Sequence, residues 1–358
     1  MEKAYILTIH PGFQDTRISI YQNSNMIFLK SIRHNVDTLN TFTKLTDQHI
    51  YRTEVIIDEL KKAGIAVENI SVIITRGGLI KPIKPGVYRI NEQLKHDLVH
   101  SPIGEHSVNL GGLIGHQIEQ IIPGSKSYIV DPVVVDELIE VARITGLPEI
   151  KRKSVFHALE QRSVARKHAA SVMKNYEDLN LIVAYSGEGV SIGAHQKGRV
   201  IDVNQAFDGE GPFSLERAGS LPPGDLVRLC FSGRYSEKEI LNLLQHDGGM
   251  KAYFNTNDPN ELEKRFEEGD KHVRLVFEAM AYHVAKSIGA LSPVLKGKVD
   301  AILLTGMVAY SRIFVDYVSE RVNHIAQIFV YPGETVMEAL AYNGQMILKG
   351  EVEVMDYE

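Results

Sequence analysis

Residues 5–21 read Y-I-L-T-I-H-P-G-F-Q-D-T-R-I-S-I-Y, and this stretch decides the fold. Two runs rich in strand-forming residues, 5–9 and 16–21, flank a Pro-Gly turn and predict a β-hairpin whose tip is lined by backbone groups. A stretch of the same shape, L-I-V-A-Y-S-G-E-G-V-S-I-G-A-H, occupies residues 181–195. Glycine-bearing tips at corresponding places in two halves predict two lobes that offer backbone N–H groups to one ligand. A phosphate is our first hypothesis for that ligand.

The composition indicates a globular protein with a sizeable core. The chain has 358 residues, of which 44% are hydrophobic, and its length favours two domains. A net charge of −6 argues against a general nucleic-acid or anionic-membrane surface. No apolar run reaches the roughly 18 residues of a membrane span and residues 1–10 lack a signal-peptide pattern, so we expect a cytoplasmic protein. Cys230 lies among leucine and valine residues and is expected to be a core thiol on a helix.

The expected elements follow the same order in both halves of the chain. In the first half we expect three strands, a helix from Asp37 or Thr38 to Ala63 ended by Gly64, a strand at 70–75, a helix through Ile122 and a strand within 128–135. In the second half a long helix over 154–175 precedes strands near 181–186, 189–195, 199–203, 299–305 and 327–331, with helices from about Ser311 and Glu334. This order predicts a duplicated α/β fold with its ligand chemistry in an interdomain cleft.

Two strand ends carry candidate functional residues. Arg76-Gly77-Gly78 follows the apolar run 70–75, at the place where ligands usually bind in open α/β sheets. A glycine turn with a solvated arginine would give the same pattern. Asp131 stands between an apolar run and a proline, and a carboxylate there is either a metal ligand or a turn residue.

Several sequence blocks indicate a family. They include R-G-G-L-I-K-P-I at 76–83, V-D-P-V-V-V-D-E at 130–137, S-V-F-H-A-L-E-Q at 154–161, D-G-E-G-P-F-S-L-E-R-A-G at 208–219 and P-G-E-T-V-M-E-A-L-A at 332–341. Over essentially its whole length the sequence resembles the butyrate kinases of the acetokinase family. The resemblance implies duplicated actin-like (ribonuclease H-like) domains with an interdomain cleft. It implies an acyl-substrate lobe of residues 1–153 plus 335–358 and a nucleotide lobe of residues 154–334.

The resemblance also implies a reaction, in which ATP and a short-chain or branched carboxylate give ADP and an acyl phosphate, with Mg²⁺ in the site. Such a transfer requires the protein to hold donor and acceptor in line and to neutralise charge. Arg76 and Arg217 would clamp the carboxylate and the phosphoryl group, and His106 would support the acyl phosphate. Asp131 and Glu338 would hold the metal directly or through water. His106 is equally well explained as a helix cap, and the possible acyl-pocket residues Val133, Val134 and Leu138 as core.

The implied nucleotide-binding residues are Gly12, Thr16, Arg17, Tyr185, Gly187, Gly189 and Gly306. Their loops depart from the family pattern. Phe13 and Asp15 replace small hydroxyl residues of N-P-G-S-T-S-T-K, and Arg17 replaces its lysine. Tyr185 and Glu188 replace the histidine and a glycine of A-H-x-G-G-G, and Met307 replaces a glycine. These acidic and bulky changes favour an alternative, a catalytically weakened paralogue that acts as a ligand sensor or structural subunit. A kinase with another donor, such as pyrophosphate, is a third hypothesis. By the same resemblance we expect a homo-oligomer.

Overall fold

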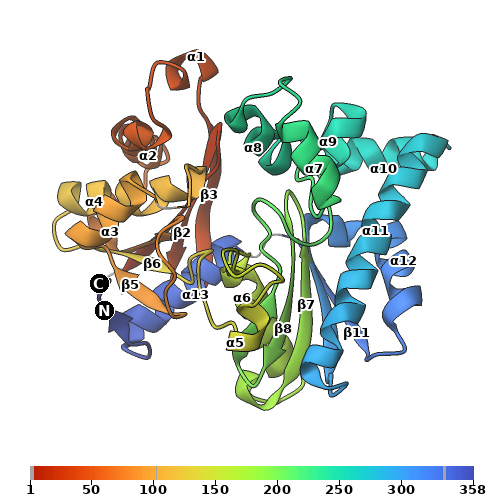
Figure 1. Cartoon of the computed structure of the whole chain (residues 1–358). Coiled ribbons are helices and arrows are strands. Elements are labelled where there is room, and N and C mark those ends of the chain that lie inside the picture. The colour runs from red at the N-terminus through yellow and green to blue at the C-terminus, as the bar shows by residue number, and fades with distance from the viewer. Residues whose placement is uncertain (1–3, 102, 334–335) are drawn as a thin grey trace. The chain divides into compact units, whose positions relative to one another are not determined.

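The protein consists of two compact units in the computed structural model, which describes residues 4–101, 103–333 and 336–358 (Figure 1). Unit 1 comprises Met1–Val135 with Thr335–Glu358, and unit 2 comprises Asp136–Glu334. The segment 136–153 therefore belongs to unit 2. Among the described residues, none of the helices combines the length and the apolar character that a bilayer crossing requires.

A twisted mixed sheet forms the centre of unit 1. Its strand order is β12-β5-β6-β4-β1-β2-β3. The strands are β1 (Tyr5–Pro11), β2 (Asp15–Gln22), β3 (Asn25–Arg33), β4 (Ile70–Arg76), β5 (Val87–Arg89), β6 (Lys126–Val130) and β12 (Val354–Met355). β1 and β2 are antiparallel, with Pro11 opposite Thr16, which confirms the predicted hairpin. β4 runs parallel to both β1 and β6, so the carboxyl ends of these strands share one edge.

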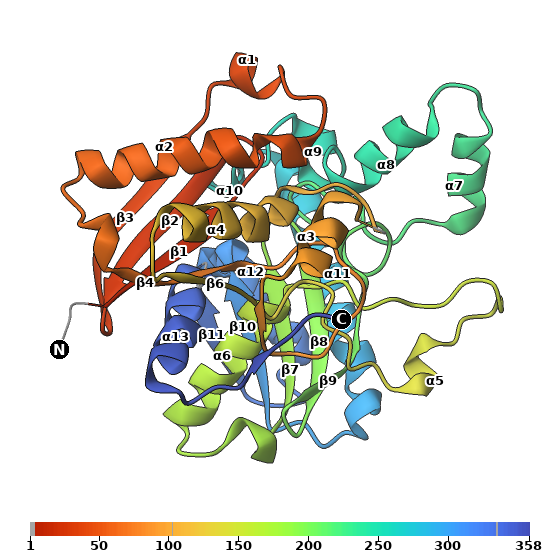
Figure 2. The same cartoon turned by 90° about the vertical axis from the view of Figure 1, so that its left-hand side faces the viewer.

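Helices cover both faces of this sheet (Figure 2). They are α1 (Val36–Leu39), η1 (Leu45–Gln48), α2 (His49–Lys62), η2 (Val67–Asn69), α3 (Glu92–Val99), η3 (Ser107–Asn109), α4 (Leu110–Ile121) and α13 (Val336–Lys349). Leu7 and Ile9 share a hydrophobic cluster with Leu60 of α2 and Ile114 of α4. Ile6 lies on the opposite face because side chains alternate along a strand, and there it packs closely against α13.

The expected single helix from residue 37 to Ala63 is wrong. Asn35, rather than Asp37 or Thr38, caps α1, because its side chain accepts hydrogen bonds from the backbone N–H groups of both residues. The helix ends at Leu39, where Thr41 Oγ1 donates to the carbonyl of Thr38, a local bond that competes with helix continuation. Regular helix resumes only at His49. Gly64 follows its end with φ +71°, as predicted.

Unit 2 repeats the sheet of unit 1. Its strands are β7 (Asn180–Ser186), β8 (Val190–Gln196), β9 (Arg199–Val203), β10 (Ala301–Gly306) and β11 (Ile328–Pro332). Their order, β11-β10-β7-β8-β9, corresponds to β6-β4-β1-β2-β3 of unit 1. β7 and β8 form the second predicted hairpin, with Ser186 opposite Val190, and β10 runs parallel to β7. The duplicated α/β fold is therefore confirmed.

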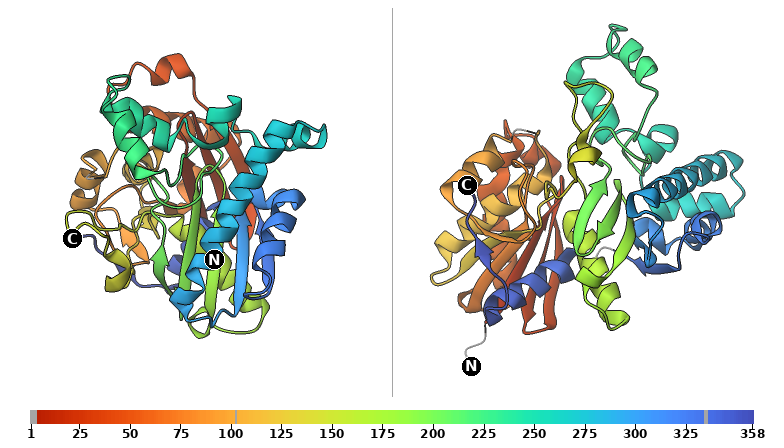
Figure 3. Two further views of the ribbon diagram at one scale, coloured as in Figure 1. Left: turned by 45° about the vertical axis from the view of Figure 1, so that its right-hand side comes forward. Right: turned by 60° about the horizontal axis from the view of Figure 1, so that its bottom comes forward.

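The helices of unit 2 again lie on both sides of its sheet (Figure 3). They are α5 (Glu140–Arg143), α6 (Ala158–Ser171), η4 (Tyr176–Asp178), α7 (Pro223–Cys230), α8 (Glu237–Gln245), α9 (Gly249–Phe254), α10 (Pro259–Glu267), α11 (Lys271–Leu291), η5 (Pro293–Leu295), η6 (Met307–Tyr310) and α12 (Arg312–Val322). Ile192 of β8 packs in one cluster with Phe277 of α11 and Phe314 of α12. Val164 of α6 packs with Val183 in a second cluster.

Two further expectations need correction. The helix expected over 154–175 is shorter, since α6 begins at Ala158 and ends at Ser171, and Met173 adopts φ +55°. The strand expected within 128–135 ends at Val130, directly before Asp131 as predicted, and Asp131 turns the chain with φ +35°. Cys230 is on a helix but exposed, because α7 places none of its side chains in the core. The last helix begins at Val336 among the described residues, and its expected start, Glu334, lies outside them.

Candidate functional site

The tip of the first hairpin is held from inside by Arg52. This fully buried side chain of α2 donates from Nη1 to the carbonyl oxygens of Gly12 (2.8 Å) and Asp15 (2.9 Å), and from Nη2 to that of Phe13 (2.7 Å). The carbonyl of Gln14 accepts from the backbone N–H of His34. Across a planar trans peptide the N–H points opposite to the preceding C=O. The N–H groups of Phe13 and Gln14 therefore point away from Arg52, as a phosphate cradle requires.

The side chains of this tip differ in where they point. Thr16 is fully buried, and its hydroxyl is bonded to His34 Nε2 (2.8 Å) and Arg52 Nη1 (3.1 Å). The carboxylate of Asp15 accepts from Ser31 Oγ (3.0 Å) and lies so close to Gly12 that a Cβ there would meet it at 2.2 Å. Phe13 is 42% exposed. One oxygen of the Asp15 carboxylate therefore lies beside Gly12 at the tip, and the other accepts from Ser31 of β3.

Positive charge gathers beside the tip around His10. The pKa of His10 lies well below its usual value, first because burial disfavours the charged imidazole and then because Arg76, Arg17 and His106 lie near it. Arg76 is the last residue of β4 and pairs with Val130 of β6, so it is next to the strand that Asp131 follows. The structure therefore brings together three of the predicted residues, Arg17, Arg76 and His106, about a neutral histidine. Such a set of cations and donors suits an anion.

His106 is held in one orientation by its own loop. Its Nδ1 accepts the backbone N–H of Val108 (3.2 Å), so the proton of the neutral ring is at Nε2. His106 therefore caps η3, which was the alternative explanation of this residue in the sequence. Its Nε2–H remains a hydrogen-bond donor. Asn109 Oδ1 accepts the N–H of Leu79 (2.8 Å) and its amide donates to the carbonyl of Gly104 (3.3 Å). Asn109 thereby joins the loop after Arg76 to the loop that carries His106.

The two predicted metal ligands are carboxylates in different settings within unit 1. Asp131 is buried, and its Oδ1 accepts the N–H of Gly86 (2.8 Å). The pKa of Tyr88 is raised, first by the burial of Tyr88 and second by the charge of Asp131. Glu338 lies in the first turn of α13. The pKa of Tyr21 is raised, first by the burial of Tyr21 and second by the charge of Glu338. Among the described residues, no set of three or more His, Cys, Asp or Glu side chains is placed to hold a metal ion. Carboxylate oxygens nevertheless fit Mg²⁺, which keeps several waters and needs only one or two of them.

The second hairpin tip brings Arg217 against a glycine. A Cβ at Gly189 would lie 2.4 Å from Arg217 Nη1, so only glycine allows this approach. Arg217 Nη1 donates to the carbonyl of Ala206 (2.6 Å), and the backbone N–H of Arg217 donates to Ser214 Oγ (2.9 Å). The hydroxyl of Ser214 in turn donates to the carbonyl of Glu188. Ser214 therefore links the backbone of Arg217 to the hairpin tip, and the two are fixed relative to each other.

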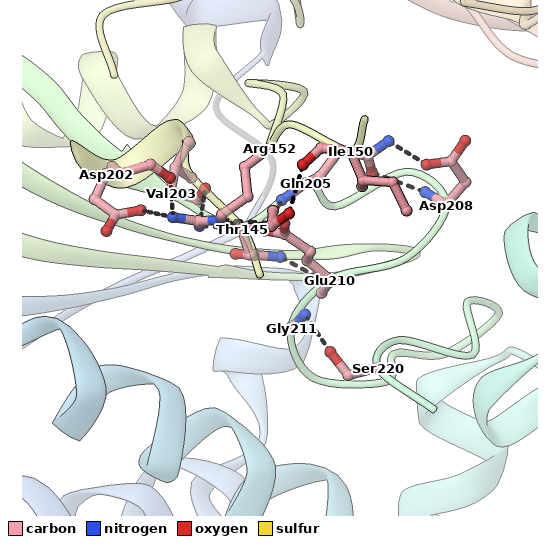
Figure 4. A network of polar contacts seen from close by, with 12 residues as sticks. Thr145, Ile150, Arg152, Asp202, Val203, Gln205, Asp208, Glu210, Gly211 and Ser220 are labelled. Atoms are coloured by element: carbon pink, nitrogen blue, oxygen red, sulfur yellow. Dashed lines mark hydrogen bonds and ion pairs between the residues drawn. The ribbon is translucent and has the colours of Figure 1, made fainter. Parts of the chain in front are cut away.

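Figure 4 shows the polar contacts that support the loop before Arg217. Arg152 Nη1 donates to Asp202 (2.8 Å), Nη2 donates to the carbonyl of Val203 (3.0 Å), and the guanidinium pairs with Glu210. Glu210 also accepts the backbone N–H of Gln205 (3.1 Å). These bonds fix the chain between β9 and Ala206, whose carbonyl binds Arg217. Arg152 therefore contributes to the position of Arg217 from a distance.

A carboxylate pair lies at the same tip. Burial, followed by the charge of Glu188, raises the pKa of Glu216 to about 7, while Arg217 opposes the shift. Asn257 Nδ2 donates to Glu216 Oε2 (3.1 Å). Burial and then Arg217 lower the pKa of His246 to about 4. Glu188 is thus close enough to a second carboxyl group to change its protonation.

Gly306 and Tyr185 lie at the edge where the strands of unit 2 end. Gly306 adopts φ +93°, and a Cβ there would lie 2.3 Å from the carbonyl oxygen of Ser186. Gly306 is therefore required by both backbone conformation and space. Tyr185 folds its hydroxyl over Gly187, where a Cβ would be 3.1 Å away. Met307, which follows Gly306, is 37% exposed.

His157 is a residue that the sequence interpretation missed. Its imidazole stacks on the ring of Tyr185 with 3.9 Å between the centroids and an interplanar angle of 22°. The residue lies just before α6, within the block S-V-F-H-A-L-E-Q that carried the family resemblance. The block itself was the only signal, because nothing in the spacing of residues 157 and 185 indicates that their rings meet.

Comparisons with known proteins agree along the whole chain. A family model described as the acetokinase family matches residues 148–328. Butyrate kinase 2 of Clostridium acetobutylicum is 46% identical over 356 residues, which cover 99% of this chain and 100% of the relative. Butyrate kinase 1 of the same organism is 46% identical over 353 residues, which cover 99% of each chain.

Solved structures agree on the fold. An acetate kinase of Porphyromonas gingivalis has a TM-score of 0.79 at 17% identity, covering 96% of this chain and 100% of that one. A propionate kinase of Francisella tularensis has a TM-score of 0.76 at 17% identity, covering 94% and 98%. These likenesses confirm the fold class of duplicated actin-like α/β domains.

Proposed function

Because the chain belongs to the acetokinase family, we propose that it is a butyrate-kinase-like phosphotransferase that converts ATP and a short-chain or branched carboxylate into ADP and an acyl phosphate. The observation that carries this proposal is the cluster of Arg17, Arg76 and His106 around the neutral His10 in unit 1. It is a site for a small anion and is built from strand ends and one capped loop. A carboxylate and an acyl phosphate are both such anions.

In the proposed reaction a carboxylate oxygen attacks the terminal phosphorus of ATP. The P–O bond to ADP breaks as the new P–O bond forms, and the electron pair of the broken bond stays on ADP. Negative charge spreads over the oxygens of the transferred group, so positioning and charge stabilisation do most of the catalysis. Arg76 and the Nε2–H of His106 would bind the carboxylate or acyl phosphate, and a planar guanidinium suits either anion.

We assign phosphate binding to backbone N–H groups and a few side chains at the two hairpin tips. In unit 1 these are the N–H groups of Phe13 and Gln14 and the side chain of Arg17. Gly12 and Thr16 shape the tip, because the N–H of Gly12 donates to the carbonyl of Asp15 and the hydroxyl of Thr16 is bonded to Arg52 inside the hairpin. In unit 2 they are Tyr185, Gly187, Gly189, Gly306 and Arg217, to which we add His157 as a donor. Asp131 and Glu338 are the carboxylates proposed to hold Mg²⁺, which when bound offsets phosphate charge.

The test is a hydroxamate assay for acyl phosphate, coupled with ADP release, using acetate, propionate, butyrate and branched acids at saturating Mg-ATP. We expect turnover with at least one acid. We expect Arg76→Ala to lower kcat/KM for the carboxylate roughly 100-fold or more, because a buried charged donor to the anion is lost. Arg89→Ala, at an exposed arginine of β5, is the matched control. Absence of turnover with every acid would contradict the proposal.

A weakened paralogue that binds a ligand without efficient turnover is the second candidate. The pair of Glu188 and Glu216 favours it, because this pair places negative charge at the tip proposed to bind phosphate. Calorimetry with Mg-ATP distinguishes the two, since micromolar binding with turnover supports a kinase. Carboxylate binding without ATP binding supports the alternative. The homo-oligomer and the cytoplasmic location implied by the family belong to the same proposal, and light scattering tests the former.

A further inference from the structure

A chain of hydrogen bonds runs through the interior of unit 2 to His157. Its members are Tyr176 of η4, His195 and Ser191 of β8, and Gln161 and His157 at α6. Tyr176 Oη is 2.7 Å from His195 Nδ1, and His195 Nε2 is 2.9 Å from Gln161 Oε1. Gln161 Nε2 is 2.8 Å from Ser191 Oγ, which is 2.8 Å from His157 Nδ1. His195, Gln161 and Ser191 are fully buried.

The direction of the chain is set by the side-chain amide of Gln161. Its nitrogen also lies 3.0 Å from the backbone carbonyl oxygen of Ser191, which can only accept. The amide nitrogen must therefore face Ser191, and the amide oxygen must face His195. Because that oxygen can only accept, His195 Nε2 carries a proton.

The other nitrogen of His195 is therefore an acceptor. Burial, followed by the charges of Arg162 and Arg166, lowers the pKa of His195 to about 3, so its ring carries one proton near neutral pH. That proton is on Nε2, as the amide of Gln161 requires. Nδ1 then accepts the hydroxyl proton of Tyr176. Tyr176, His195 and Gln161 are thus joined by bonds of one direction.

Ser191 connects the amide of Gln161 to His157. Ser191 Oγ accepts one proton from the amide of Gln161 and lies 3.4 Å from the backbone N–H of His157, a second donor. A hydroxyl oxygen has two lone pairs, and these two donors use both. The proton of Ser191 is then directed to His157 Nδ1, which accepts it. His157 therefore carries its own proton at Nε2.

We propose that Gln161 and His195 are positioning residues that fix His157 as the Nε2–H tautomer and so make it a hydrogen-bond donor beside Tyr185. The consequence for catalysis rests on the proposed phosphotransfer, whereas the tautomer itself does not. A phosphate oxygen accepts hydrogen bonds, so an Nε2–H binds it and an unprotonated Nε2 repels it. Ring nitrogens are generally set in this way by the bond that the other nitrogen makes.

The direct test is ¹⁵N NMR of the full-length protein labelled at histidine, because the two neutral tautomers give different shifts for the two ring nitrogens. His157→Asn and His195→Asn remove, and thereby assign, the two signals. We expect Nε2–H for both His157 and His195 in the wild type. Nδ1–H at either residue would overturn the proposal.

Two variants test whether the chain of hydrogen bonds determines the tautomer of His157. Gln161→Met keeps the size of the side chain and removes both its donor and its acceptor, so we expect His157 to populate both tautomers. Tyr176→Phe removes one hydroxyl at the far end with little change of packing, and we expect His195 to keep its proton at Nε2, because Gln161 Oε1 still accepts it. Retention of the wild-type tautomer of His157 in folded Gln161→Met would overturn the proposal.

A matched control lies on the same helix. His168 Nδ1 is bonded to the hydroxyl of Tyr331 (3.0 Å), outside the chain described above. Tyr331→Phe therefore removes a tyrosine-to-histidine bond without touching Gln161, and we expect the signals of His157 and His195 to stay unchanged. A shift of His157 in Tyr331→Phe equal to that in Gln161→Met would show a general loosening and contradict the proposal.

The kinetic arm separates this inference from the proposed function. We expect Gln161→Met to lower kcat roughly 10- to 100-fold with little change of KM for the carboxylate, while Tyr331→Phe stays at the wild-type value. An inactive wild type would refute the kinase and leave the NMR result to decide the tautomer. A normal kcat together with mixed tautomers at His157 would refute the positioning role alone.

Discussion

Arg52 shows how one buried side chain can determine the shape of a ligand loop. It holds the carbonyl groups of Gly12, Phe13 and Asp15, and Arg52→Ala would leave them without these donors. We expect the variant to lose about 3 kcal/mol or more of unfolding free energy, because unpaired buried polar groups are costly. Urea unfolding measures this loss. Lys61→Ala, at an exposed residue of the same helix, should change stability by less than about 0.5 kcal/mol.

Glu216 makes stability depend on pH. Its pKa is about 7 in the folded protein and about 4.3 in an unfolded chain. The folded state therefore retains a proton that the unfolded state loses first, and the stabilisation present below about pH 4 is lost as the pH rises through 7. We expect Glu216→Gln to be more stable than the wild type at pH 8 by up to about 3 kcal/mol, with a much smaller difference at pH 5.

Urea unfolding at the two pH values measures this difference. Glu237→Gln removes an exposed carboxylate of α8 and serves as the control, for which we expect no such dependence. An equal gain at pH 5 and pH 8 would mean that Glu216 is not protonated in the folded protein. Glu188→Gln should recover part of the gain, because the charge of Glu188 is the second cause of the shift.

The sequence could identify residues that lie on recognisable motifs, and three of them, Arg17, Arg76 and His106, each act on the pKa of His10. It could not identify Arg52 or His157 as parts of a site, because their partners lie far away in sequence and no spacing rule connects them. The direction of the Asp15 carboxylate, which accepts from Ser31 Oγ, is a rotamer choice that the order of residue types does not encode.

At the scale of elements, the turn between β7 and β8 is fitted to Arg217. No positive φ is required at Gly189, so alanine is acceptable to the backbone, yet its Cβ would lie 2.4 Å from Arg217 Nη1. We expect Gly189→Ala to displace the guanidinium and lower kcat/KM roughly 100-fold without a comparable loss of stability, because a shift of about 1 Å is that costly for a positioned group. Steady-state kinetics and urea unfolding check both parts.

Gly146→Ala is the matched control for that substitution. A Cβ at Gly146 would meet nothing within 4 Å, and we expect wild-type kinetics. Wild-type kinetics in Gly189→Ala would show that Arg217 either moves without consequence or takes no part in the reaction.

Strands were easier to predict than helix boundaries for a physical reason. The runs of β1, β4 and β7 are buried on both faces, so their apolar sequences leave little choice. The region from Asn35 to His49 contains several residues that can cap a helix or bond locally, and periodicity cannot show which of them does so. Asn35 is the N-cap of α1 because its side chain accepts hydrogen bonds from two backbone N–H groups.

At the scale of the molecule, unit 1 is completed by residues from the far end of the chain. α13 packs on β1 and β4, and Leu340 is fully buried there. Leu340→Ala should cost about 2–5 kcal/mol, the usual range for a truncated core leucine. We expect hydrogen exchange to become faster in β1 and β4, more than 250 positions away in sequence, and to remain unchanged in β7 and β10 of unit 2. Leu348→Ala, at a residue of α13 that is 41% exposed, should leave exchange unchanged in both units. Faster exchange in β7 and β10 as well would mean that the two units unfold together. The two compact units would then not be independent in their stability.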